Sequence, residues 1–282
     1  MGKFIISAFA DEYDKQFSEQ LCALRKFGIH NIELRFIDGK NVADITSSEA
    51  IELKRKLDEC GIVVSAIGSP IGKIALDGDM EGHLAIAEGV FANAKILGTD
   101  RVRMFSFYPP KGRSIGDCRE KVIESLERLV TLAESYGITL CHENEAKIYG
   151  ETAESCLDIM EHFGGRIKAV FDMGNFTLEK HDPFKAYELL REHISYFHIK
   201  DALSAGAIVP PGKGEAGIRD ILSMHAQYTD EDIVITLEPH LQTFSGLNAL
   251  TDSKFENPYK YETPQAAFAD AVEKLKEIVG SI

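Results

Sequence analysis

Cysteine pairs, long apolar runs and an excess of positive charge are all missing from this chain of 282 residues. The five cysteines are scattered and odd in number, and no C-x-x-C pair occurs. This excludes a disulfide framework and a zinc ribbon, and it predicts reduced thiols and a cytoplasmic protein. The cysteines are Cys22, Cys60, Cys118, Cys141 and Cys156. Cys141 lies in an apolar run, where we expect packing, because no base is positioned to make it a nucleophile.

Membranes and nucleic acids are not expected as partners. No apolar run approaches the roughly 20 residues of a transmembrane helix. The apolar start of the chain is followed at once by Asp11, Glu12 and Asp14, which favours a first strand over a secretory signal. Acidic residues number 45 against 31 basic ones, a formal net charge of -14. A surface of that sign repels phosphate backbones.

Apolar runs typical of buried strands alternate with helical patterns along the whole chain. The expected strands cover residues 4–9, 31–35, 62–67, 101–107, 138–143, 167–172, 194–199 and 233–238. The expected helices cover residues 17–27, 48–60, 79–97, 115–136, 152–163, 182–192, 218–228 and 265–278. Glycines that favour left-handed caps follow five of these helices, at Gly28, Gly61, Gly98, Gly137 and Gly164. Ser47 or Ser48 is placed to cap the second helix.

This uninterrupted series favours an α/β fold, a single (β/α)8 TIM barrel over residues 1–282, since such barrels typically need ~250 residues. The rival fold is a doubly wound open sheet, which shows the same alternation. No G-x-G-x-x-G follows the first strand, which weakens the dinucleotide-binding form of that rival. The longest irregular stretch, residues 239–263, is expected to lie over the barrel mouth or to form a contact in a homo-oligomer.

Four successive strands each end in a side chain that can bind a metal ion. These side chains are Glu143, Asp172, His198 and Glu238. Because the carboxyl ends of barrel strands meet at one face, we expect the four to converge. Any one of them alone is more simply a solvated carboxylate or a core histidine, but four in succession favour a shared site. Three carboxylates around one imidazole are costly unless a divalent cation neutralises them.

The donor types predict both the cation and its chemistry. Oxygen ligands with one imidazole suit one Mn²⁺, Mg²⁺ or Co²⁺ ion, with Zn²⁺ as an alternative. Such an ion would polarise a carbonyl and the adjacent hydroxyl of a sugar. A nearby carboxylate can then remove the acidified proton. Glu143 and Glu238 are the expected catalytic residues, each binding the metal through one oxygen and carrying a proton on the other.

Polar residues near the strand ends are candidates for substrate contacts. Lys200 shares the side of the strand that carries His198, and it is either a substrate contact or an ion-pair partner of a ligand carboxylate. Arg35 and Arg103 are placed to hold a phosphate or carboxylate, or to form ion pairs at the rim. Alternation turns some of these side chains outward. The further candidates for substrate contacts are Asn175, Arg103, Glu33, His142 and His240.

Five motifs carry these residues through the second half of the chain: HENE, FDMGN, HIKD, PPGKGE and LEPH. Through them the chain resembles the xylose isomerase-like barrel superfamily, in the branch of sugar-phosphate isomerases and epimerases. The resemblance extends over nearly the whole chain. It is specific for the superfamily and weak for the substrate. It implies a carbohydrate substrate, metal binding by Glu143, Asp172, His198 and Glu238, and proton transfer by the two glutamates where the reaction is epimerisation.

Departures from the family pattern leave other activities open. Ketose 3-epimerases of the superfamily usually have histidine at the position of Asn175 and a second glutamate near Tyr149, so ketohexose 3-epimerisation is not favoured. An inosose-type dehydratase and a non-catalytic sugar-binding barrel stay as alternatives. Endonuclease IV-type phosphodiester cleavage needs further ligands, a histidine at Asn175 and an Asp-x-His near residues 211–213, and the acidic charge also disfavours it.

Overall fold

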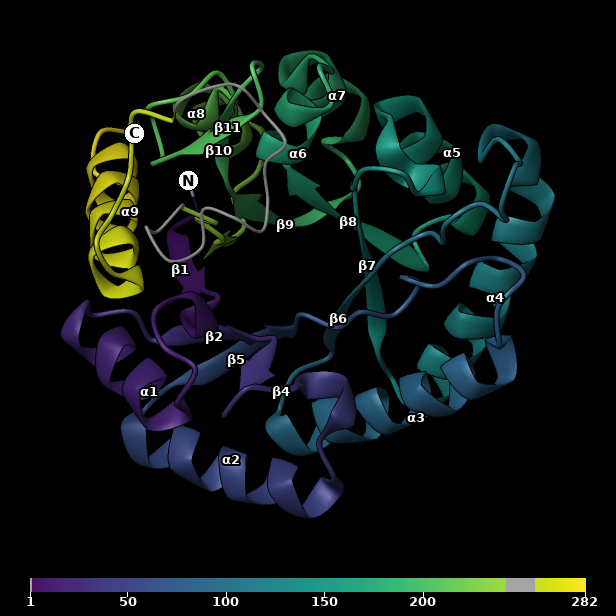
Figure 1. Cartoon of the computed structure of the whole chain (residues 1–282), viewed down its shortest axis with the longest axis horizontal. Coiled ribbons are helices and arrows are strands. Elements are labelled where there is room, and N and C mark those ends of the chain that lie inside the picture. Colours follow the sequence, from purple (N-terminus) through teal and green to yellow (C-terminus); the bar gives the residue numbers. More distant parts are fainter. Residues whose placement is uncertain (1, 242–256) are drawn as a thin grey trace.

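Eight parallel strands form a nearly closed α/β TIM barrel in the described part of the computed structural model, residues 2–241 and 257–282 (Figure 1). The strands are β1 (Phe4–Ala8), β2 (Asn31–Leu34), β5 (Val63–Ile67), β6 (Arg101–Met104), β7 (Thr139–Glu143), β8 (Ile167–Asp172), β9 (Ile194–Ile199) and β12 (Ile233–Leu237). Their order around the sheet is β1-β12-β9-β8-β7-β6-β5-β2. The predicted barrel is therefore confirmed. After each strand the chain runs back through a helix on the outside of the barrel.

Helices surround the barrel as an outer ring (Figure 1). They are α1 (Phe17–Lys26), α2 (Ser47–Cys60), α3 (Met80–Leu97), α4 (Arg119–Ser135), α5 (Ala153–Phe163), α6 (Met173–Leu178), α7 (Pro183–Leu190), α8 (Ile218–Tyr228) and α9 (Pro264–Val279). Short 3-10 turns add η1 (Ala10–Glu12), η2 (Val42–Asp44), η3 (Gly116–Cys118) and η4 (Tyr149–Glu151). Of the helices described, none has the length and apolar character to cross a bilayer.

Helix ends follow the capping chemistry of the sequence, with one correction. Gly28, Gly61, Gly98, Gly137 and Gly164 all have positive φ, as predicted. The expected cap of α2 at Ser47 or Ser48 is wrong, because Thr46 is the N-cap and both serines lie inside the helix. The Thr46 hydroxyl accepts the backbone N–H of Glu49, and the Glu49 carboxylate accepts that of Thr46 at 2.6 Å. This reciprocal capping box satisfies donors that a serine one residue later would leave unpaired.

Besides the 3-10 turns, three small elements were not predicted. Two antiparallel hairpins leave the barrel at its carboxyl-terminal face, β3–β4 (Phe36–Ile37 with Lys40–Asn41) and β10–β11 (Asp201–Leu203 with Ala207–Val209). Helix α6 begins directly after β8, with the Asp172 side chain as its N-cap. The predicted long segment over residues 239–263 lies largely outside the described residues.

Two apolar cores stabilise the barrel. The smaller fills its interior below the mouth, with residues from five strands: Ala66, Cys141, Val170, Tyr196 and Val234. Cys141 thus packs as expected, and burial raises the pKa of its thiol to about 12. The larger core lies between the sheet and the helices and includes fully buried Phe91, Leu129 and Phe268. Each such side chain contributes about 1.5–3 kcal/mol through burial.

The barrel closes between β1 and β2 without a backbone ladder, because these two strands are the edges of the eight-stranded sheet. Side chains bridge the junction instead. The hydroxyls of Ser7 in β1 and Ser65 in β5 lie 2.7 Å apart, and Ser65 donates to the carbonyl oxygen of Ile32 in β2 at 3.1 Å. We call this junction the β1–β2 seam.

A glycine in the loop after β5 gives a sharp test of packing at the mouth. Gly72 has a φ of +86°, and a Cβ added there would overlap the carbonyl group of Phe105. Gly39 has a similar φ of +78°, but its Cβ would meet nothing within 4 Å. We therefore expect Gly72→Ala to lower the free energy of unfolding by about 3 kcal/mol, since strain and overlap add. Gly39→Ala isolates the strain and should cost about 1 kcal/mol. Chemical denaturation measures both, and equal losses would contradict the packing argument.

Candidate metal centre

Four ligand-type side chains meet at the carboxyl-terminal face of the barrel. Glu143 and Asp172 end β7 and β8, His198 is the penultimate residue of β9, and Glu238 directly follows β12. All four are buried, and one ligand atom from each lies within 4.8 Å of the others. The sheet register explains the convergence, because Asp172 pairs with His198 and the β12 residue Leu237 pairs with Ile199. The structure thus brings together the four residues that the sequence singled out.

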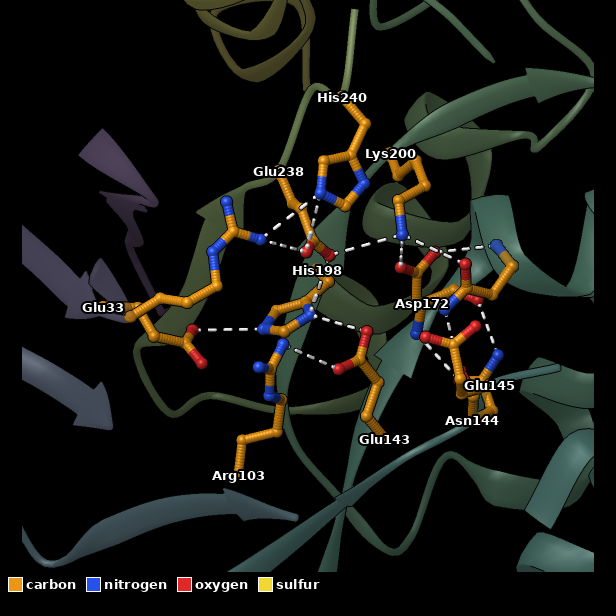
Figure 2. Close-up of polar contacts among 12 residues, drawn as sticks. Glu33, Arg103, Glu143, Asn144, Glu145, Asp172, His198, Lys200, Glu238 and His240 are labelled. Atoms are coloured by element: carbon orange, nitrogen blue, oxygen red, sulfur yellow. Dashed lines mark hydrogen bonds and ion pairs between the residues drawn. The ribbon is translucent and has the colours of Figure 1, made fainter. Parts of the chain in front are cut away.

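The imidazole of His198 lies at the centre of the group (Figure 2). Its Nδ1 atom is 3.0 Å from Oε1 of Glu143 and 3.3 Å from Oε2 of Glu238. Its Nε2 atom is 3.1 Å from Oε2 of Glu33. Phe9 packs edge-on against the imidazole, with ring centroids 5.1 Å apart. The ring is therefore held on several sides and is not exposed to solvent.

Each of the two glutamates uses its second oxygen to bind an arginine. Arg103 Nη1 donates to Oε2 of Glu143 at 3.0 Å, and Arg35 Nη1 donates to Oε1 of Glu238 at 3.0 Å. Arg103 is buried, whereas Arg35 reaches the rim and also donates to Oδ2 of Asp11 at 2.9 Å. Both arginines are therefore engaged by carboxylates, the ion-pair alternative of the sequence interpretation.

The ammonium group of Lys200 lies between Asp172 and Glu238. Its ammonium lies 2.8 Å from Oδ2 of Asp172, 3.0 Å from Oδ1 of Asn175 and 3.3 Å from Oε2 of Glu238. Asp172 in turn accepts the backbone N–H of Asn175 through Oδ1 at 2.8 Å. Of the two alternatives for Lys200, the structure shows the ion pair with Asp172, and Asn175 fixes the positions of both.

Asn144 also shapes the site, although the sequence interpretation gave it no role. Its side-chain oxygen accepts the backbone N–H of Asp172 at 3.0 Å, and its amide donates to the Asp172 carbonyl at 2.9 Å. The amide of Asn175 donates to the Asn144 carbonyl at 2.9 Å. These bonds lock the end of β8 against β7. The place of Asn144 directly after Glu143 in HENE is the only signal that pointed to it.

Asp201 orders the PPGKGE loop from the position next to Lys200. Its carboxylate accepts the backbone N–H groups of Gly212, Gly214 and Ala216 at 2.7, 2.9 and 3.2 Å. It is buried, and a chain of N–H donors is a good partner for a buried carboxylate. One side chain therefore fixes the backbone of this loop.

Two further candidate contacts have different positions. The ring of His142 contacts Ser106 through Nε2 at 2.9 Å and makes no contact with the four ligand-type side chains. Burial lowers its pKa to about 4, so the ring is neutral. Its expected role as a substrate contact is therefore not supported by its position. His240 lies at the rim, 37% exposed, with Nε2 3.4 Å from both Glu12 and Glu238.

Burial and charge act against each other in the ligand carboxylates. Burial raises the pKa of Glu143, but His198 and Arg103 outweigh it and bring that pKa to about 2. In Asp172 burial dominates over Lys200 and raises the pKa to about 6. Burial lowers the pKa of His198, yet the surrounding carboxylates hold it well above its usual value. The neighbouring cations therefore balance the carboxylates, which in turn keep His198 positively charged.

The residues present fit one divalent cation. Three carboxylates and one imidazole form a donor set that suits such an ion. The Oε2 atom of Glu238 is buried and has no hydrogen-bond partner, although it faces His198 and Lys200 at 3.3 Å. An unsatisfied buried carboxylate oxygen is costly, and a cation at this point would satisfy it.

Comparison with known proteins places this geometry in a family. The family model described as xylose isomerase-like TIM barrel matches residues 21–278. No curated protein matches the sequence significantly. Solved structures of enzymes with the same fold do match over nearly the whole chain.

Three solved structures illustrate the likeness. The 3-keto-D-glucoside 4-epimerase from E. coli has a TM-score of 0.72 at 14% identity, and the comparison covers 99% of this chain and 99% of that one. A xylose isomerase-like TIM barrel protein from Mycobacterium smegmatis, in complex with magnesium, has a TM-score of 0.71 at 16% identity, with 100% and 97% covered. The probable 3-DHS dehydratase of petrobactin synthesis from Bacillus anthracis has a TM-score of 0.68 at 17% identity, with 84% and 92% covered. At these identities the likeness shows the fold alone.

Proposed function

This chain belongs to the xylose isomerase-like TIM barrel family, and from that premise we propose that it is a divalent-metal-dependent isomerase or epimerase of a small sugar. The observation that carries the proposal is the approach of two carboxylates to one point. Glu143 and Glu238 come from strands on either side of β8 and β9, and both lie against Nδ1 of His198, at 3.0 and 3.3 Å.

The chain's own residues have distinct parts in such a reaction. A bound divalent cation would polarise the substrate carbonyl and stabilise the negative charge of an enediolate. Asp172 and His198 would hold the ion, and one glutamate would remove the proton from the carbon next to the carbonyl. In epimerisation the other glutamate would take up a proton from solvent and deliver it to the opposite face, while the first releases its proton to solvent. In isomerisation a proton would be delivered to the neighbouring carbon, and the hydroxyl proton would pass to the former carbonyl oxygen. Lys200 donates a hydrogen bond to a substrate oxygen from beside Asp172.

Proton exchange with solvent tests this function. A panel of small ketoses, aldoses and keto-sugars is incubated in D₂O with Mn²⁺, Mg²⁺ or Co²⁺, and NMR follows loss of the C–H signal and the product configuration. Mn²⁺ samples are stripped of the ion before spectra are recorded. The proposal is supported if the product contains deuterium and otherwise has the same molecular formula as the substrate. Ligand binding without any exchange would instead indicate a sugar-binding barrel.

Dehydration is the second candidate, since a 3-DHS dehydratase shares the fold and the same carboxylates can begin an elimination. After proton removal, loss of a hydroxyl from the adjacent carbon would give a product lighter by one water. Mass spectrometry of the same reactions separates the two, because isomerisation and epimerisation conserve mass. A product lacking one water would replace the isomerase proposal.

An uncharged sugar is the substrate class that the charges of the site favour. Among the described residues around the ligand group, Arg35, Arg103 and Lys200 each already contact a carboxylate. A phosphate would have to compete with these carboxylates and would meet their repulsion, which costs several kcal/mol for close like charges. We expect kcat/KM for a neutral sugar to exceed that for its phosphate ester by at least about tenfold. Matched pairs in the panel measure this, and preference for the phosphate would contradict it.

A further inference from the structure

The two ring nitrogens of His198 have different surroundings. Nδ1 faces Glu143 and Glu238, which are proposed to share the cation. Nε2 faces Glu33 alone, at 3.1 Å. Figure 2 shows Glu33 and Glu143 on opposite sides of the imidazole. The ring therefore has one edge toward the ligands and one edge toward β2.

Glu33 is itself fixed from below. Its second oxygen, Oε1, accepts the hydroxyl of Tyr196 at 3.0 Å. Tyr196 precedes His198 by two residues in β9, so both side chains point into the barrel. Glu33 and Tyr196 are each 1% exposed, and Tyr196 belongs to the interior core. A substrate at the mouth does not reach Glu33, so its expected role as a substrate contact has no support in its position.

A neutral imidazole has one nitrogen that donates and one that accepts. Both oxygens of Glu33 act as acceptors here, one for Tyr196 and the other facing Nε2. Glu143 and Glu238 face Nδ1 as acceptors in the same way. A cation bound between them would take the place of the proton on Nδ1, while the hydrogen on Nε2 would stay with Glu33 and leave the lone pair on Nδ1. Only that tautomer directs a lone pair to the point where Glu143 and Glu238 meet.

We propose that Glu33, held by Tyr196, is a positioning residue that fixes the tautomer and orientation of His198, so that Nδ1 is the atom that binds the cation. The inference rests on the proposed metal site and deepens it. Partners of this kind typically change metal affinity 10- to 100-fold, because they fix the ligand before the ion arrives.

Metal affinity tests the role without recourse to turnover. Calorimetric titration with Mn²⁺ compares the wild type with Glu33→Leu, which removes the acceptor, and with Glu33→Gln, which keeps an acceptor oxygen. We expect Kd to rise by about 10- to 100-fold in Glu33→Leu and by less in Glu33→Gln. Tyr196→Phe frees Glu33 to rotate and should raise Kd by up to about tenfold. Unchanged Kd in folded Glu33→Gln and Tyr196→Phe would overturn the proposal even if Glu33→Leu does not fold.

Two control variants separate positioning from general stability. Tyr187→Phe also removes a buried hydroxyl that contacts an imidazole, since Tyr187 Oη lies 3.3 Å from Nδ1 of His225, away from the site. Glu145→Gln neutralises a carboxylate that pairs with Lys73 at 3.1 Å. Neither contacts His198, so neither should change Kd. An equal rise in the controls would show a structural effect only and would overturn the proposal.

The tautomer itself is directly observable. In ¹⁵N-labelled protein loaded with Mg²⁺, long-range histidine spectra should show the proton of His198 on Nε2. A proton on Nδ1 would overturn the inference. Loss of turnover is not needed for this result: if the metal binds, the Glu33 variants weaken it and no sugar exchanges deuterium, the proposed reaction fails while the inference stands. A protein that exchanges deuterium but binds metal equally well in every Glu33 variant gives the reverse outcome.

Discussion

Glu143→Gln is expected to lower kcat by about 10²- to 10⁴-fold, the usual contribution of a positioned general base. The amide cannot accept a proton at physiological pH, and it is a weaker ligand than a carboxylate. The change is nearly isosteric, so the packing of β7 should survive. Arg103 loses its charged partner at 3.0 Å, which adds a destabilisation of about 1–3 kcal/mol. Steady-state kinetics with the substrate found by NMR measure the loss, and near-ultraviolet circular dichroism confirms the fold.

The matched control for this variant is Glu145→Gln, two residues further along the same HENE motif. Glu145 pairs with Lys73 at the rim and lies outside the ligand group. It should keep kcat within about twofold, as is usual for surface changes. Full activity in folded Glu143→Gln would refute the proton-transfer role. An equal loss of kcat in both variants would indicate that the structure of the barrel mouth is disturbed, and not that a proton-transfer group is missing.

Removal of the divalent cation is expected to reduce turnover to the background rate. The carboxylates are then paired with Arg35, Arg103, Lys200 and His198, which balance charge but do not supply a Lewis acid to polarise a carbonyl. One equivalent of Mn²⁺ or Mg²⁺ should restore activity. A metal that binds the folded protein but not the unfolded chain also raises the free energy of unfolding, by about 2.7 kcal/mol at a metal concentration of 100 times Kd. Activity after chelation and thermal unfolding with and without metal measure these effects.

Asp172→Asn separates this effect from unspecific ion binding. The substitution removes one ligand charge, and its amide can still donate or accept at the N-cap of α6. The variant should respond little to added metal, both in activity and in thermal midpoint. Undiminished turnover in protein shown to be metal-free would refute a metal-dependent reaction. A stabilisation that persists in Asp172→Asn would place the ion elsewhere.

Most of the fold was predictable because each strand is a buried apolar run, and glycines and other loop residues mark where the elements end. Glycines close α2, α3 and α5 in left-handed caps, and those boundaries were correct within a residue or two. Helix α6 was missed because it is only six residues long and almost entirely buried, so it has no polar face and no helical period to detect. The β10–β11 hairpin has three residues per strand, which are too few to show an alternating pattern of apolar and polar residues.

The ligand types were predictable from strand ends, but their partners were not. Glu33, Arg35 and Arg103 all occur near the ends of strands, and the sequence could not rank them. Their separate parts depend on the stagger between strands, which places Glu33 below His198 and Arg35 above it toward the rim. Alternation alone assigns a side of the strand and not a depth in the barrel. His142 is a different case: it is next to Glu143 in the chain, so alternation alone places it on the opposite side of β7.

The β1–β2 seam lies between two sets of site residues. Glu143, Asp172 and His198 are on strands joined by continuous backbone hydrogen bonds, with β12 joined to them on the other side. Arg35 follows β2, which is an edge strand of the sheet, and its guanidinium binds Glu238 from that edge. Arg35 also pairs with Asp11 and Glu12, which follow β1, so its guanidinium closes the seam at the mouth, where no backbone ladder does. A substitution of Arg35 would therefore loosen the seam and release Glu238 at the same time.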